Sequence, residues 1–229
     1  MSMIEVNNLT KIYGKKSPTF KALDDVTLKI EDKSTVSIIG KSGSGKSTLM
    51  HIMSGLDEPS SGTVLIDGVD IFKMKEKKID AFRASEMSFV FQSFFVEGNA
   101  TCYQNVLLPL EIAKVGITKR KKMVMEALKA VDLEDKVSAK ASTLSGGQKQ
   151  RLAVARAIVN KPAIIFADEP TGNLDSINGD KIMDLLFGLN KSLGCTLIIV
   201  THDPDIAKQT SMRVSIKDGR IENIEKGRK

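Results

Sequence analysis

Apolar residues along this chain of 229 residues fall into two patterns, short continuous runs and longer stretches of helical period. The continuous runs are rich in β-branched and aromatic residues, which is typical of buried strands. They lie at residues 34–39, 87–91, 163–167 and 195–200. Residues 49–56 follow the first run and place apolar side chains at helical spacing. This alternation predicts an α/β fold whose core is a mostly parallel sheet.

The segments nearest the N-terminus have a different pattern, in which strands are linked by turns. The pattern predicts strands at residues 4–6, 10–13, 22–30 and 63–66, with turns at 14–18 and 67–68. Because these segments are short, we expect them to pair antiparallel. They predict an N-terminal antiparallel β subdomain, and residues 214–221 predict a further small hairpin near the other end.

A helical period returns at residues 105–133, where Leu107, Leu110 and Ile112 begin an apolar stripe and the basic residues 119–122 mark a helix start. This stretch predicts an α-helical subdomain inserted in the core at about residues 93–157. We expect one domain over residues 1–229, because this length suits a single α/β domain with a smaller appendage.

Composition narrows the class of protein without specifying its chemistry. The hydrophobic content of 41% and charged content of 27% are ordinary for soluble globular proteins. No apolar run reaches the ~18 residues that cross a membrane, and the N-terminal residues lack a signal-peptide pattern. Two distant cysteines, Cys102 and Cys195, indicate free thiols in a reducing cytosol. We interpret the net charge of +6 as solvated surface and expect no nucleic-acid partner.

The strongest chemical signal is residues 40–48, which fit the phosphate-binding loop pattern. They lie between a predicted strand and a predicted helix, as that loop requires. The glycines let backbone N–H groups surround phosphate oxygens, and the helix N-terminus adds the positive end of its dipole. Lys46 can reach the β- and γ-phosphates, and the Ser47 hydroxyl can ligate Mg²⁺.

A second candidate anion site is Ser145-Gly146-Gly147-Gln148, at the start of another predicted helix. Ser145 suits the N-cap position, and two glycines follow it at the helix N-terminus. An ordinary capped helix start and a second anion-binding site are equally compatible with these residues.

Acidic residues and a histidine follow two of the apolar strands. Asp168 and Glu169 close the run at 163–167, and His202 follows the run at 195–200. The carboxyl ends of parallel strands are where α/β sheets bind ligands. Asp168 can hold Mg²⁺ there, and Glu169 can orient or deprotonate an attacking water.

Taken together, these features resemble the ATP-binding subunit of an ABC transporter over essentially the whole chain. The resemblance rests on an ordered set: Tyr13, the loop at 40–48, Gln92, Leu144 to Gln148, Asp168 with Glu169, Asn173 to Asp175, and His202. It implies a P-loop NTPase core and a homodimer in which two subunits pair head to tail around ATP. It further implies hydrolysis of ATP by in-line transfer of the γ-phosphoryl group to water.

The resemblance also implies residue roles. The nucleotide-binding residues would be Tyr13, Gly40, Lys41, Ser42, Gly43, Ser44, Gly45, Lys46, Ser47 and Thr48 in one subunit and Ser145, Gly146, Gly147 and Gln148 in the other. Tyr13 would stack on adenine, and Asp175 would link the two sites. Ser47, Gln92 and Asp168 would hold Mg²⁺. The catalytic set would be Lys46, Gln92, Glu169, which positions the water, and His202, which contacts the γ-phosphate.

Finer features are similar to the subunits of MacB, LolD and bacitracin-resistance exporters, notably residues 170–175 and 105–110. This resemblance implies a separate integral membrane permease, a location in the cytoplasm on the inner face of the cell membrane, and export or extraction of a peptide, lipopeptide, lipoprotein or drug. We expect the permease to dock a short cytosolic helix in a groove between residues 92–101 and the helical subdomain. Two positions depart from the family: Lys41 replaces a usual proline, and residues 94–101 lack the usual apolar, proline-containing run.

Other ATPase classes fit less well. A DNA-repair ATPase would need a long coiled-coil insert, a translation-factor ATPase would need two cassettes, and a non-catalytic nucleotide switch would lack Glu169. A division-type cassette that transmits force to a cell-wall hydrolase, without moving a solute, remains compatible with the sequence.

Overall fold

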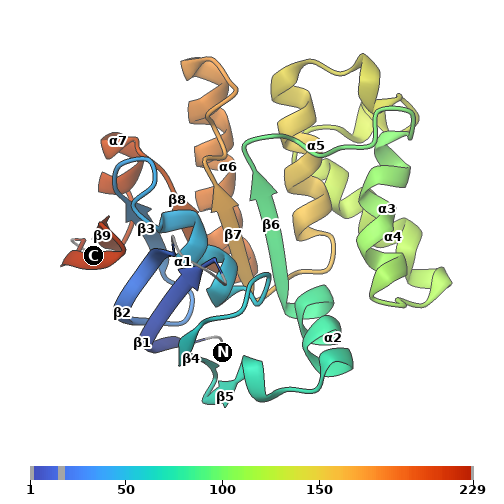
Figure 1. Ribbon diagram of the computed structural model, residues 1–229. Coiled ribbons are helices and arrows are strands. Elements are labelled where there is room, and N and C mark those ends of the chain that lie inside the picture. Colours follow the sequence, from blue (N-terminus) through green and yellow to red (C-terminus); the bar gives the residue numbers. More distant parts are fainter. Residues whose placement is uncertain (1–2, 15–18, 228–229) are drawn as a thin grey trace.

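The computed structural model describes residues 3–14 and 19–227, so most of the turn predicted at 14–18 lies outside the described residues. Its main sheet has six strands in the order β10-β9-β3-β8-β7-β6 (Figure 1). The strands are β3 Thr35–Ile39, β6 Met87–Phe91, β7 Ile164–Asp168, β8 Thr196–Val200, β9 Met212–Lys217 and β10 Arg220–Lys226. All pair parallel except β10, which runs antiparallel to β9.

A second sheet is antiparallel and contains the N-terminal strands. Its order is β2-β1-β4-β5, formed by β1 Ile4–Tyr13, β2 Phe20–Ile30, β4 Ser61–Ile66 and β5 Val69–Asp70. The strands predicted at 4–6 and 10–13 form one strand with irregular register, in which Asn8 has a positive φ of 48°. The predicted fold class, an α/β fold with a mostly parallel core sheet and an N-terminal antiparallel sheet, is confirmed.

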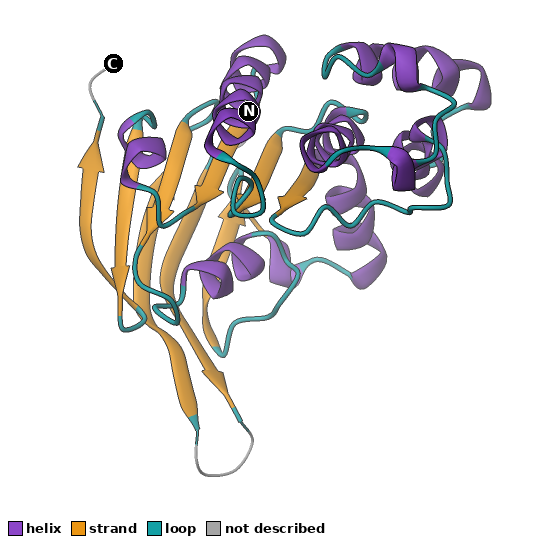
Figure 2. Cartoon of the chain, turned by 90° about the horizontal axis from the view of Figure 1, so that it is seen from above, coloured by secondary structure: helices purple, strands orange, loops and turns teal. Residues whose placement is uncertain are grey.

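Helices cover the main sheet and extend beyond its β6 edge (Figure 1). The α-helices are α1 Lys46–Met53, α2 Glu76–Glu86, α3 Cys102–Ile112, α4 Ile117–Lys129, α5 Gly146–Ile158, α6 Ser176–Leu193 and α7 Pro204–Lys208. Short 3-10 helices lie at Ile71–Lys73, Glu134–Lys136 and Ala141–Thr143. The view from above shows the strands lying side by side, with α3 to α5 grouped at one side (Figure 2).

Alternate residues of the central strands face two separate hydrophobic cores. Ile164 and Phe166 of β7 pack with the antiparallel sheet and α1, whereas Ile165 and Ala167 pack with α3 to α6. Burial on both faces explains why these strands are continuously apolar rather than alternating. The main sheet is therefore the middle layer of the fold.

The helices α3, α4 and α5 lie within or just beyond the range predicted for the inserted helical subdomain. The hydrophobic core that holds them is continuous with Ile165 of β7 and Leu197 of β8. The boundaries at 93 and 157 stay a prediction.

Two details of the predicted helices are wrong. The first helix ends at Met53, and Leu56 lies beyond it with 48% of its surface exposed, because Gly55 turns the chain with a φ of 68°. In α3 the buried stripe is Cys102, Val106 and Leu110, so Ile112 is exposed. Within the described residues, no helix is both long and apolar enough to cross a membrane.

Phe166 provides a test of the two-sided burial. Its side chain is fully buried, and its ring stacks on that of Phe89 with centroids 5.5 Å apart. We expect Phe166→Ala to lower the free energy of unfolding by ~3–5 kcal/mol, measured by urea denaturation, because it leaves a core cavity. Phe95→Ala is the matched control, since that ring is 67% exposed, and it should cost much less. Equal costs would contradict this account of the core.

Candidate functional site

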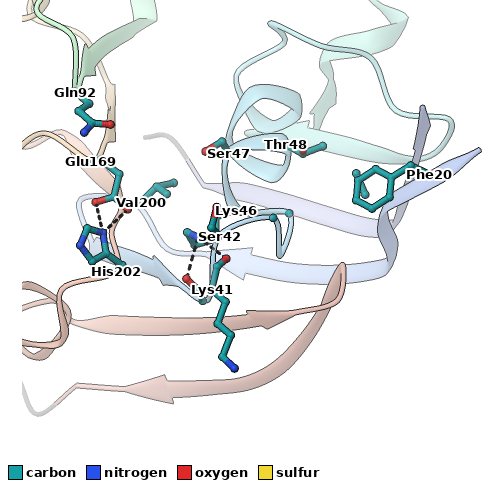
Figure 3. Close-up of a pocket in the computed structure, with 14 residues that line it drawn as sticks. Phe20, Lys41, Ser42, Lys46, Ser47, Thr48, Gln92, Glu169, Val200 and His202 are labelled. Atoms are coloured by element: carbon teal, nitrogen blue, oxygen red, sulfur yellow. Dashed lines mark hydrogen bonds and ion pairs between the residues drawn. The ribbon is translucent and has the colours of Figure 1, made fainter. Parts of the chain in front are cut away.

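One cavity of about 700 Å³ lies at the carboxyl ends of the parallel strands (Figure 3). Its lining residues are Phe20, Ala22, Gly40, Lys41, Ser42, Gly43, Gly45, Lys46, Ser47, Thr48, Gln92, Glu169, Val200 and His202. The strand register explains this convergence, because Phe91 pairs with Asp168, Asp168 with Val200, and Val200 with Ile38. The residues that follow these strands therefore lie at the same edge of the sheet.

The loop that connects β3 to α1 forms the floor of this cavity. Gly45 is the N-cap of α1 and has a φ of 105°, which favours glycine. A Cβ at Gly45 would lie 2.5 Å from the backbone oxygen of Ala22, and one at Gly40 would overlap the backbone oxygen of Ile216. These close backbone approaches require glycine. Because the N-cap of α1 is a glycine without a side chain, no side chain covers the helix N-terminus, and an anion can approach it.

Lys46 is held inside the loop. Its Nζ donates hydrogen bonds of 2.9 Å to the backbone oxygens of Gly40 and Lys41 (Figure 3). Ser44, which the resemblance counts among the nucleotide-binding residues, is not among the residues that line the cavity, and its buried Oγ has no hydrogen-bond partner among the described residues. The loop thus concentrates a cation and several donors in a small volume, which suits a polyphosphate.

Ser47 and Asp168 bring two oxygen ligands together. The Ser47 Oγ donates to Asp168 Oδ1 across 3.3 Å. Burial raises the pKa of Asp168, and the hydrogen bond from Ser47 partly offsets that rise. The described residues contain no group of three or more His, Cys, Asp or Glu suited to a metal ion. Two hard oxygens beside a phosphate loop nevertheless fit Mg²⁺, which keeps several waters and completes its shell with phosphate oxygens.

Glu169 and His202 form a contact at the opposite wall of the cavity. The His202 Nδ1 lies 3.0 Å from both carboxylate oxygens of Glu169 (Figure 3). Glu169 has a φ of 47°, an uncommon conformation for a residue with a side chain. Its N–H donates to the backbone oxygen of Val200 at 2.9 Å. Strained backbone of this kind costs roughly 1–3 kcal/mol and is concentrated at functional sites.

Gln92 follows β6 and lies at the edge of the cavity above Glu169 (Figure 3). Its side chain contacts Asn173, which belongs to the Asn173–Asp175 motif and to which the sequence assigned no role of its own. Hence the cavity gathers the loop at 40–48, Gln92, Glu169 and His202, with Asp168 beside Ser47.

The residues at the start of α5 and α6 lie elsewhere. Ser145 caps α5, its Oγ accepts from the N–H of Gln148 at 3.3 Å, and Gln148 Oε1 accepts from the N–H of Ser145. Asp175 caps α6, and hydrogen bonds from the backbone and side chain of Asn178 hold its pKa below the usual value. None of residues 144–148 lines the described cavity, so one chain does not bring them to the phosphate loop.

Tyr13 is not among the described residues that line the cavity. Its hydroxyl donates to Asp57 Oδ2 at 2.6 Å, and Lys11 Nζ lies 4.8 Å from its ring centroid. Burial, followed by the bond to Asp57, raises its pKa. Phe20, which pairs with Tyr13 across the β1–β2 ladder, lines the cavity instead. Sequence reasoning missed Phe20, because it lies before the strand predicted at 22–30 and faces Tyr13 only through the register of the hairpin.

The comparisons with known proteins agree with one another. The family model described as ABC transporter matches residues 23–172. The lipoprotein-releasing system ATP-binding protein LolD of Leptospira interrogans is 44% identical over 97% of this chain and 92% of its own length. The uncharacterized ABC transporter ATP-binding protein YvrO of Bacillus subtilis is 43% identical over 98% of each chain.

A solved structure extends this similarity to three dimensions. The dimeric post-hydrolysis structure of the ATP-binding cassette MJ0796, bound to ADP and Pi, aligns with a TM-score of 0.89 at 40% identity and covers 99% of each chain.

Lys46 provides the test of this cavity. We expect Lys46→Ala to remove most of the rise in melting temperature that ATP gives the wild-type chain, because the cradle loses its buried cation. Thermal unfolding with and without ATP measures this. Lys122→Ala is the matched control, because that side chain is 82% exposed on α4 and does not line the cavity, and it should retain the stabilisation. A Lys46→Ala protein that ATP stabilises as strongly as wild type would contradict the assignment.

Proposed function

The chain belongs to the ABC transporter family as an ATP-binding subunit that hydrolyses ATP, and on that premise we propose that it powers the export or extraction of an amphipathic molecule. A lipoprotein is the first candidate, with a peptide, lipopeptide or drug as related possibilities. The supporting observation is the 44% identity to a lipoprotein-releasing ATP-binding protein over 97% of the chain. No observation favours a division-type cassette.

We assign the nucleotide roles from the positions of the side chains. The loop at 40–48 holds the phosphates, with Lys46 moving from its own loop carbonyls to phosphate oxygens. Ser47, Asp168 and Gln92 would hold Mg²⁺, which supplies charge neutralisation at the phosphates. Glu169 orients and deprotonates the attacking water, and His202, already 3.0 Å from Glu169, contacts the γ-phosphate.

Adenine is assigned to the side of the cavity formed by the β1–β2 hairpin. Tyr13 remains our proposal for the ring that stacks on the base, since burying an aromatic face against a purine is favourable. Phe20 lines the cavity from the neighbouring strand and provides a second apolar surface there.

The cavity of one chain lacks the second anion-binding segment, residues 145–148. Residues 145–148 cap a helix whose N-terminus is open to an anion, but they do not line the cavity of their own chain. We propose that they complete the cavity of a second copy, giving a homodimer that sandwiches two ATP molecules. Asp175, at the start of α6, would link the two sites.

A permease would dock at the groove between β6, α2, α3 and α5, which has a volume of about 280 Å³. The groove is lined by Ala84, Met87, Ser88, Phe89, Phe91, Leu108, Pro109, Ile112, Arg156, Ala157 and Asn160. We propose that a short apolar helix of a separate membrane protein occupies it, which places this subunit peripherally on the inner face of the cell membrane.

This groove lies beside the stretch that the sequence suggested for docking, not within it. None of residues 93–101 lines the groove among the described residues. The Asn105 side chain explains this, because it bonds both the N–H and the carbonyl of Glu97 and folds the stretch back on α3. Arg156 adds a second restraint through a 2.6 Å bond to the backbone oxygen of Phe95.

Glu169 is the residue on which hydrolysis should depend. We expect Glu169→Gln to lower the steady-state ATPase rate ~10²–10⁴-fold while ATP still binds, because an amide cannot accept the proton of the attacking water. The matched control is Glu222→Gln, an exposed residue paired with Lys217 on the last hairpin, which should leave the rate unchanged. A Glu169→Gln protein with near wild-type turnover would exclude Glu169 as the base.

Ile112 tests the docking groove. This side chain is 62% exposed, and we expect Ile112→Glu to reduce co-purification with the tagged native permease at least about tenfold, because a charged group is costly to bury in an apolar contact. The ATPase rate of the isolated subunit should not change. Ile224→Glu, on the far edge strand β10 and 41% exposed, is the matched control. If Ile112→Glu retains the permease as well as wild type does, the docking site lies elsewhere.

A further inference from the structure

Two side-chain amides face each other at the edge of the cavity, although 81 residues separate them in the sequence. Asn173 Nδ2 donates to the backbone oxygen of Gln92 at 3.0 Å. Gln92 Nε2 in turn donates to Asn173 Oδ1 across a longer 3.4 Å. Asn173 therefore contacts both the backbone and the side chain of Gln92.

The chemistry of these groups allows only one arrangement of the two amides. A backbone carbonyl can only accept, so Asn173 must present its NH₂ group to the Gln92 backbone. Its own oxygen then faces the Gln92 side chain, and an oxygen acceptor can pair only with the NH₂ end of that amide. The Gln92 Oε1 is left on the opposite side, and Figure 3 shows it directed toward the side of the cavity where Ser47 lies.

Gly172 makes this arrangement possible sterically. A Cβ at Gly172 would lie 2.6 Å from Gln92 Nε2 and 3.0 Å from its Cδ, closer than side chains tolerate. The Gln92 amide therefore lies directly over the backbone of Gly172. Alanine at this position would displace the amide without removing Asn173.

Helix α5 holds the backbone on both sides of the Gln92–Asn173 pair. Gln150 of α5 is fully buried, and its Nε2 donates to the backbone oxygens of Phe91 at 3.2 Å and Pro170 at 2.6 Å. The end of β6 and the segment after β7 are thus held together next to Gln92 and Gly172. The Gln92 side chain itself is contacted by Asn173 and lies against Gly172.

We propose that Asn173 is a positioning residue that turns the carbonyl oxygen of Gln92, rather than its NH₂ group, toward the metal at the phosphate loop. The proposal rests on the function proposed above, in which Gln92 shares Mg²⁺ with Ser47 and Asp168. Mg²⁺ accepts oxygen ligands, so an amide presenting NH₂ would repel it. Ligands are commonly oriented by such a second hydrogen bond.

The test measures binding rather than turnover. Isothermal titration gives the dissociation constant of the non-hydrolysable analogue AMP-PNP in EDTA and in Mg²⁺. The constant in EDTA divided by the constant in Mg²⁺ reports how much the metal strengthens binding. We expect Asn173→Ala to reduce this ratio roughly two- to tenfold, the effect of one lost neutral hydrogen bond, while the constant in EDTA stays unchanged. Gly172→Ala should reduce the ratio as well, through displacement of the amide.

Three control variants distinguish a positioning role of Asn173 from a general effect on the structure. Gly188→Ala, at a helical glycine with no atom within 4 Å of the added Cβ, should not alter the ratio. Gln92→Ala should lower it, and adding Asn173→Ala to Gln92→Ala should lower it no further. An additional loss in that double variant, or an unchanged ratio in Asn173→Ala when Gln92→Ala lowers it, would overturn the proposal while leaving the metal site intact. A wild-type ratio near one would overturn the metal site itself, and the positioning role with it.

Discussion

Burial of the main sheet on both faces is the constraint on which the rest of the structure depends. β7 and β8 send alternate side chains into two cores, so their registers with β3 and β6 are fixed by packing. The parallel strands β3, β8, β7 and β6 then end at one edge. Because of this, one cavity gathers the phosphate loop, Gln92, Glu169 and His202, although they are far apart in the sequence. The geometry of the cavity is in this sense a consequence of core packing, and Glu169 has its positive φ of 47° at that edge.

The same architecture is the basis for proposing that a single chain holds only part of the site. Helix α5 is held by the helical core on the far side of β6, and its capped N-terminus therefore lies away from its own phosphate loop. Yet its side chains also reach back to the cavity, since Gln150 bonds the residues before Gln92 and after Glu169. Arg156 of the same helix holds the chain just after Gln92. A movement of α5 would therefore shift the segments next to the nucleotide site and the lining of the proposed docking groove. It would also shift residues 145–148, which we propose contact a second copy.

The sequence predicted the sheet, the phosphate loop and the acidic residues, because each depends on local pattern and chain order. It failed where long-range contacts decide the outcome. Ile112 leaves the buried stripe of α3, which only tertiary packing determines. The end of the first helix before Leu56 is a different kind of miss, because Gly55 marks it locally. The role of Asn173 depends on a partner 81 residues away, and the position of Phe20 depends on the register of a hairpin. Local propensity contains neither piece of information.

The central claim is that each cavity is completed by residues 145–148 of a second copy around ATP. Light scattering of the Glu169→Gln protein, with and without Mg²⁺ and ATP, tests it most directly. The account predicts the mass of one chain without nucleotide and twice that mass with ATP, because the unhydrolysed γ-phosphate bridges the two halves. A mass that ATP leaves unchanged would contradict the shared site and favour an ATPase that works within a single subunit.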